Sequence, residues 1–112
     1  DTIIKNRNLS SKQEFMAGVI YHHGFTISSS RKSLFYAKEA YEKGYKPAKT
    51  LIAQATDRLL HLQGKPQKFG TQAIQTKRGK WKMWKIDKSI TDKERKNYGL
   101  PSLSQLKKYL NE

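Results

Sequence analysis

The segment 57–72 holds the densest group of side chains in this chain that could take part in chemistry. It reads D-R-L-L-H-L-Q-G-K-P-Q-K-F-G-T-Q, so an acid and a base are followed by a glycine-proline break and a polar loop. Amides and hydroxyls cost free energy when they are buried without hydrogen bonds, so a scaffold alone does not require them beside such a break. The composition of the segment indicates a site, but it does not name a reaction.

Asp57 and Arg58 allow two interpretations of this segment. Asp57 falls within an apolar stripe of its helix, so its carboxylate is predicted to be buried and to need a partner. In the first interpretation, the pair clamps the 65–72 loop to the helix. In the second, the polar groups surround a bound anion or phosphodiester, with His23 nearby. The predicted site residues are Asp57, Arg58, Gln72 and His23, with catalytic roles, and Gln67, Phe69 and Thr71, with binding roles.

The three histidines are the next candidates. His23 falls within the apolar stripe of the first predicted helix. It is either a hydrogen-bonded core residue or a general acid or base, since imidazole titrates near neutrality. His22 is expected to be exposed, and His61 to form a solvated pair with Asp57 one turn earlier. Three histidines without a suitable spacing, in a chain without cysteine, predict neither a metal site nor a cofactor.

The net charge of +14 predicts a polyanionic partner. Between residues 65 and 96 the chain carries eleven basic and three acidic residues, a net of +8, so the excess lies in the second half. Such a field attracts nucleic acid, an anionic lipid surface or an acidic protein. The plain alternative is a lysine-rich surface that only keeps the protein in solution.

Two predicted strands, 71–76 and 80–86, form a hairpin around the turn at 77–79. Alternation sends Trp81 and Trp84 to opposite faces, so one tryptophan is expected in the core and the other partly exposed among lysines. An aromatic ring among basic residues is typical of single-stranded nucleic-acid binding. Ordinary packing tryptophans on a lysine-rich strand are the alternative. The predicted binding residues are Lys77, Arg78, Lys80, Lys82, Trp84 and Lys85.

Start and stop signals predict three helices before this hairpin. Ser11-x-x-Glu14 forms a capping box for the first, and the serines at 28–30 cap the second. Pro47 opens a third helix that reaches Gln63 and is apolar on two sides, so it is expected at the centre. The face of the first helix predicted to point inward consists of Phe15, Met16, Val19, Ile20 and His23.

Two further capping boxes, T-D-K-E and S-L-S-Q, predict two short C-terminal helices. The fold class is therefore mainly α (α+β), with a three-helix core, a β-hairpin and these two helices. The length predicts a single domain, 1–112, whose residues 1–10 are linker-like. No apolar run approaches the roughly 20 residues of a membrane span. A start at Asp1 rather than methionine predicts that a leader or an upstream domain has been removed, and the compartment stays open.

Two resemblances accompany these patterns. The run A-K-E-A-Y-E-K-G-Y-K-P-A-K-T-L-I-A resembles one helical hairpin of the Sel1 and tetratricopeptide repeats, which implies close helix stacking. Over nearly the whole chain, D-R at 57–58, G-K-P-Q-K-F-G-T-Q at 64–72, T-D-K-E-R at 91–95 and G-L-P-S-L at 99–103 resemble an uncharacterised bacterial domain family. Its signature is D-R…G-x-P-Q-x-[FY]-G-T-Q. This resemblance implies that these positions matter to the domain, but it implies no activity.

Together these features favour a small basic domain that engages nucleic acid, RNA rather than DNA. Its sharper form is a metal-independent RNA-cleaving effector or toxin domain, in which His23 is the base for the 2'-hydroxyl and Arg58 binds the phosphate. The alternative is a non-catalytic helical-repeat module that binds an acidic protein partner. A third is a cell-envelope protein that acts on anionic glycans. The sequence decides neither whether the protein is an enzyme nor its oligomeric state.

Overall fold

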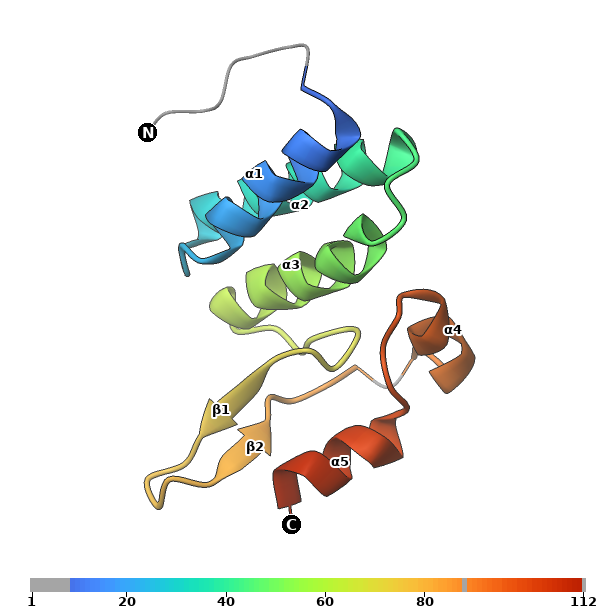
Figure 1. Ribbon diagram of the computed structural model, residues 1–112. Coiled ribbons are helices and arrows are strands. Elements are labelled where there is room, and N and C mark those ends of the chain that lie inside the picture. The colour runs from blue at the N-terminus through green and yellow to red at the C-terminus, as the bar shows by residue number, and fades with distance from the viewer. Residues whose placement is uncertain (1–8, 88, 112) are drawn as a thin grey trace.

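The computed structural model describes residues 9–87 and 89–111, which form a mainly helical fold with one small antiparallel sheet. The class and the order of elements are those predicted. The first eight residues of the linker-like start predicted for 1–10 lie outside the described residues. Figure 1 shows α1 and α2 at one end, α3 in the middle, and the hairpin, α4 and α5 at the other end. The elements are α1 (Ser11–His22), α2 (Ile27–Glu42), α3 (Ala48–Leu62), β1 (Ala73–Gln75), β2 (Trp81–Met83), α4 (Asp92–Asn97) and α5 (Leu103–Asn111).

Side-chain caps fix where most of these helices begin. α1 is capped one residue earlier than predicted, by the extended residue Ser10. Its hydroxyl accepts from the Gln13 N–H, and its own N–H donates to Gln13 Oε1. The N-cap of α2 is Thr26, and of the serines at 28–30 predicted to cap it only Ser29 takes part, as the reciprocal partner in the capping box. The boxes predicted before the C-terminal helices form as expected, at Thr91 with Glu94 and at Ser102 with Gln105.

α1 packs on α2 through small residues rather than through its large apolar ones. The Ser33 hydroxyl donates to the Gly18 carbonyl over 2.8 Å, and a Cβ added to Gly18 would lie 3.0 Å from Leu51 Cδ2. The predicted inward face of α1 is therefore wrong in part: Met16 and Ile20 are exposed, whereas Phe15 and Val19 are partly buried. A face of small residues allows the helix backbones to approach more closely than a face of long side chains, and this closer packing decides which side is buried.

α3 lies at the centre of the fold, as its two apolar sides predict. One side packs against α2. On the other side, Ala53 joins Phe69 and Ile90 in a small buried cluster, against which Tyr98 and Leu100 are packed. The helix thus connects the N-terminal helices with the C-terminal half of the chain.

The β1–β2 hairpin is shorter than the predicted strands. Its turn at 77–79 is the predicted one, and Gly79 adopts a φ of +80°, which glycine takes without strain. After β2 the chain leaves β1 and forms a bridge between Ile86 and Gln67 of the loop, which is why the second strand ends early. The register pairs Ala73 with Met83, Ile74 with Lys82 and Gln75 with Trp81.

Candidate functional site

Asp57 is fully buried and binds the loop that follows α3. Its carboxylate accepts hydrogen bonds from the backbone N–H groups of Lys68 at 2.7 Å, Phe69 at 2.9 Å and Thr71 at 2.9 Å. The Thr71 hydroxyl donates a fourth bond at 2.7 Å. Four donors compensate a carboxylate for the water it loses on burial. The predicted clamp is confirmed, and Asp57 is occupied by the loop.

Gln67 is also fully buried and connects the same loop to the base of the hairpin. Its Nε2 donates to the carbonyls of Gln72 at 2.9 Å and Trp84 at 2.8 Å, and its Oε1 accepts from the Gln72 N–H at 2.8 Å. Both amide protons are therefore used within the protein. Of the other predicted binding residues of this loop, Phe69 is buried in the cluster on α3 and Thr71 is bonded to Asp57.

Arg58 joins the end of α1, α3 and the start of the hairpin. Its Nε donates to Gln72 Oε1 at 2.8 Å and its Nη1 to the His22 carbonyl at 2.8 Å. Its guanidinium carbon lies 4.2 Å from the centroid of the Phe25 ring, a cation–π contact. Burial lowers the pKa of Arg58. Arg58 and Gln72 converge as predicted, but they bind one another, and no carboxylate in the described part of the chain pairs with this arginine.

His22, and not His23, is the histidine that meets Arg58. His22 is half-buried, with Nε2 3.4 Å from Arg58 Nη2, whereas His23 caps α1 and is exposed. The predicted inward position of His23 is therefore wrong, and so is the exposed position of His22, because α1 buries its small-residue face instead of its large apolar one. Loss of water, followed by the charges of Arg58 and His23, lowers the pKa of His22 to about 4. At pH 7 the ring beside Arg58 is neutral.

His61 packs against Trp84 and does not pair with Asp57 as predicted. The two rings meet edge to face with their centroids 4.5 Å apart, and Trp84 Nε1 donates to the Lys65 carbonyl at 2.9 Å. Trp84 was a predicted binding residue, but it is half-buried and held by these contacts. Asp57 has no free oxygen for His61 because the loop N–H groups and the Thr71 hydroxyl already occupy both.

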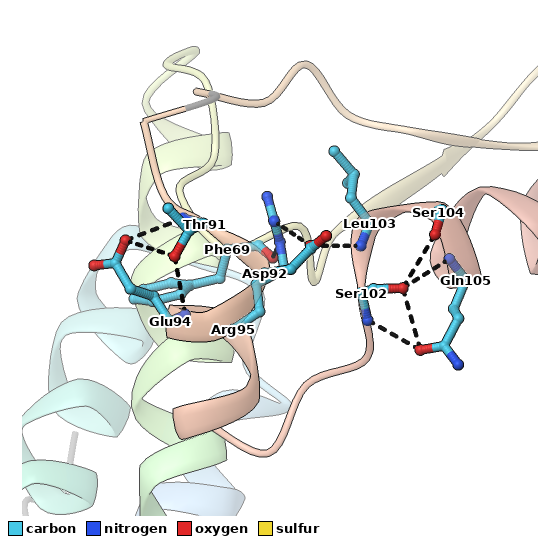
Figure 2. Close-up of polar contacts among 9 residues, drawn as sticks. All are labelled: Phe69, Thr91, Asp92, Glu94, Arg95, Ser102, Leu103, Ser104 and Gln105. Carbon is cyan, nitrogen blue, oxygen red and sulfur yellow. Dashed lines mark hydrogen bonds and ion pairs between the residues drawn. The ribbon is translucent and has the colours of Figure 1, made fainter.

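Arg95 is a buried cation to which the sequence analysis gave no role. It is 2% exposed, and it donates to the Phe69 carbonyl at 3.3 Å and to Asp92 Oδ1 at 2.8 Å. Figure 2 shows that Asp92 also accepts the N–H of Leu103, at 2.9 Å, so the loop, α4 and the start of α5 are joined. The T-D-K-E-R run contained this information, because an aspartate and an arginine three residues apart share one face of a helix.

Phe25 is the second residue that sequence reasoning missed. Its φ is +53°, a left-handed conformation that is rare for an aromatic residue, and its ring is 64% exposed beside Arg58. No sequence pattern marks this residue, since its conformation belongs to the short turn between α1 and α2. Together with Arg58 it places an aromatic ring and a cation near the base of the hairpin.

The hairpin exposes one aromatic ring and several cations. Trp81 is 54% exposed, and it, rather than Trp84, is the tryptophan that faces water. None of the basic residues here forms an ion pair with a carboxylate among the residues that the structure describes. All five predicted basic residues are exposed: Lys77, Arg78, Lys80, Lys82 and Lys85.

No model of a protein family, no curated protein and no solved structure matches this chain. The two resemblances seen in the sequence therefore stay predictions. Within residues 9–87 and 89–111, no group of three or more histidine, aspartate or glutamate side chains is arranged to hold a metal ion. No helix of these residues is long and apolar enough to cross a membrane.

Proposed function

We propose that this protein binds single-stranded nucleic acid, RNA in preference to DNA, through the outer hairpin. The observation that carries the proposal is the exposure of Trp81, at 54%, on a hairpin that bears five exposed cations, of which Lys85 lies at the base over the Trp84 ring. When a base stacks on an exposed indole, apolar surface is removed from water, which favours binding. Proteins that bind single strands use such rings for stacking and nearby cations for the phosphates. We call this the hairpin surface, made of Lys77, Arg78, Lys80, Trp81, Lys82 and Lys85.

The geometry of the hairpin favours a flexible single strand. Trp81 and its cross-strand partner Gln75 share one face of the two-stranded sheet, and alternation places Lys82 on the other. Lys77 and Arg78 lie in the turn, from which long side chains reach either face. A single strand is able to stack a base on Trp81 while its backbone passes around the turn.

Fluorescence polarisation with a labelled single-stranded RNA, repeated over a salt series, tests this proposal. The hairpin variant, Lys80→Gln/Lys82→Gln/Lys85→Gln, should bind more weakly. The slope of its log Kd against log salt concentration should decrease by about two units, since each lost phosphate contact on a single strand lowers this slope by roughly 0.7. A control variant removes the same charge from exposed positions on α1 and α2 and should keep affinity and slope: Lys12→Gln/Arg31→Gln/Lys38→Gln.

Equal losses in the two variants would show that net charge alone drives binding, and unchanged affinity in the hairpin variant would contradict the proposal directly.

A second candidate is the module that binds an acidic protein. It is favoured by a groove of about 570 Å³ on the outer face of α1, lined by Lys12 and by the exposed Met16 and Ile20. Apolar contacts carry little of the salt dependence of phosphate contacts, so binding to such a partner should change less with salt.

RNA cleavage stays a separate prediction, because the side chains assigned to it do not form the expected pair. His23 is exposed, and Arg58 is bonded to Gln72 and His22. A time course on labelled RNA with EDTA present tests it, using the wild-type protein and His23→Ala. Cleavage that His23→Ala abolishes would support the prediction, and equal cleavage by both proteins would assign the chemistry to other residues.

A further inference from the structure

A pocket away from the hairpin holds a second group of cations and aromatic rings. It has a volume of about 510 Å³ and lies where α2 ends, α3 begins and α4 ends. In Figure 1 these helix ends lie on the side of the fold opposite the hairpin turn. Neither aspartate nor glutamate lines it. Its cations and rings are Tyr41, Lys46, Lys49, Lys96 and Tyr98.

Lys49 stands between the two rings of this pocket. Its Nζ lies 5.5 Å from the centroid of the Tyr41 ring and 4.9 Å from that of Tyr98. In the described part of the chain, no carboxylate forms an ion pair with Lys46, Lys49 or Lys96. Like charges that share a pocket repel one another, so an anion bound among these ammonium groups would be stabilised.

The pocket is held in shape by contacts beneath it. The Thr50 hydroxyl donates to the Tyr98 carbonyl at 2.7 Å, which fixes the end of α4 on the first turn of α3. Gly99 adopts a φ of +73°, and a Cβ there would lie 2.7 Å from Thr50 Oγ1, so only glycine allows this approach. The Tyr98 ring also packs on Phe69 of the core, with centroids 4.5 Å apart. A ligand would meet rings and cations that are already in place.

We propose that this pocket binds a nucleotide, with its lysines on the phosphate and the exposed ring of Tyr41 on the base. Lysine binds phosphate as a point charge, and aromatic rings stack on any base. The volume lies within the range of small-molecule sites. A free mononucleotide and the phosphorylated end of a nucleic-acid strand present the same chemistry. The pocket does not require the hairpin surface, so the two proposals stand or fall separately.

Separate NMR titrations of the ¹⁵N-labelled chain with AMP, adenosine and inorganic phosphate test the proposal. AMP should shift the amide signals of Thr50, Tyr98 and Gly99, and it should bind about tenfold more tightly than adenosine or phosphate alone. Titration with a short RNA, with and without a 5'-phosphate, tests by the same amide signals whether the pocket binds a phosphorylated strand end. Shifts from AMP or from the phosphorylated end support the proposal. Absence of shifts from both would overturn it.

Two variants localise the binding. The pocket variant, Lys46→Gln/Lys49→Gln/Lys96→Gln, should lose about tenfold or more in AMP affinity, whereas the α1–α2 control variant and the hairpin variant should keep it. Tyr41→Leu should lower AMP affinity to that of phosphate and leave phosphate binding unchanged. Equal AMP affinity in the pocket variant and the control, with both folded by circular dichroism, would overturn the proposal. If the hairpin variant still binds AMP, the nucleotide pocket is shown to be independent of the hairpin surface.

Discussion

The loop after α3 and the outer hairpin are both rich in polar side chains, and they use them in opposite ways. In the loop, the oxygens of Asp57 and the amide of Gln67 are bonded to backbone groups of the protein itself. In the hairpin, the ring of Trp81 and the ammonium groups of the lysines face water. A dense polar motif therefore does not by itself mark a binding site. What decides is whether donors and rings remain free after the chain has folded.

The chemistry of the side chains explains this difference. Short carboxylates and amides match backbone N–H and C=O groups, so they suit a buried clamp. Lysine carries a strongly hydrated charge on a flexible stem, so it suits a surface that meets phosphates. We expect substitutions in the loop to change the free energy of unfolding and substitutions in the hairpin to change binding.

The largest effect is expected from Asp57→Ala. Removal of the carboxylate leaves three backbone N–H groups, buried or partly buried, and the Thr71 hydroxyl without their acceptor, so the free energy of unfolding should fall by about 3–5 kcal/mol. Urea denaturation measures it. Asp87→Ala removes an exposed carboxylate whose one bond within the described residues is from the N–H of Ser89, and it should cost about 1 kcal/mol or less. Similar costs at the two positions would contradict the clamp.

A smaller and more local effect is expected from Gln67→Leu. Leucine cannot bond the N–H and C=O of Gln72 or the carbonyl of Trp84, so we expect a loss of about 2 kcal/mol. Hydrogen exchange of the hairpin amides should accelerate, while amides of α1 and α2 keep their protection. The exposed Gln63→Leu is the control. Uniform acceleration across the whole chain would show that Gln67 supports the entire fold and not the hairpin base in particular.

Acid should destabilise the protein through His22, whose pKa is about 4 in the folded state against 6.5 ordinarily. Between these values the unfolded chain binds a proton that the folded chain does not. The contribution of the neutral His22 ring to the free energy of unfolding is therefore complete above about pH 6.5 and is lost as the pH falls toward 4. Water screens this half-buried ring, so the expected loss is about 1 kcal/mol. His22→Gln should flatten the stability curve in this window, because it removes the group whose pKa differs between the folded and unfolded states. An unchanged slope in His22→Gln would contradict the assignment.

The sequence predicted the clamp because the position of Asp57 follows from the period of its own helix. An acid within an apolar stripe needs partners, and the adjacent polar loop was the nearest supply. The hairpin turn at 77–79 and the last two capping boxes were predictable for the same reason, since they depend on residues only a few positions apart.

The incorrect predictions concern positions where the packing between helices decides which face of a helix is buried. α1 has one apolar face with Met16 and Ile20 and another face of small residues around Gly18, and helical period alone does not say which is buried. The close contact of Gly18 with Ser33 of α2 settles it, and the same rotation exchanges the environments of His22 and His23. The roles of the tryptophans depended in the same way on where the chain leaves the hairpin after β2.

Tryptophan fluorescence tests the central claim most directly, because the chain has only two tryptophans. Trp84→Phe leaves only Trp81, and Trp81→Phe leaves only Trp84, so each region is observed alone. Single-stranded RNA is titrated into both variants up to the concentration that saturates binding by polarisation. Stacking on the hairpin surface predicts strong quenching of Trp81 and little change at Trp84, whose ring is packed against His61. Quenching of Trp84 alone, or of neither ring at saturation, would contradict the proposal that nucleic acid lies on the open face of the hairpin.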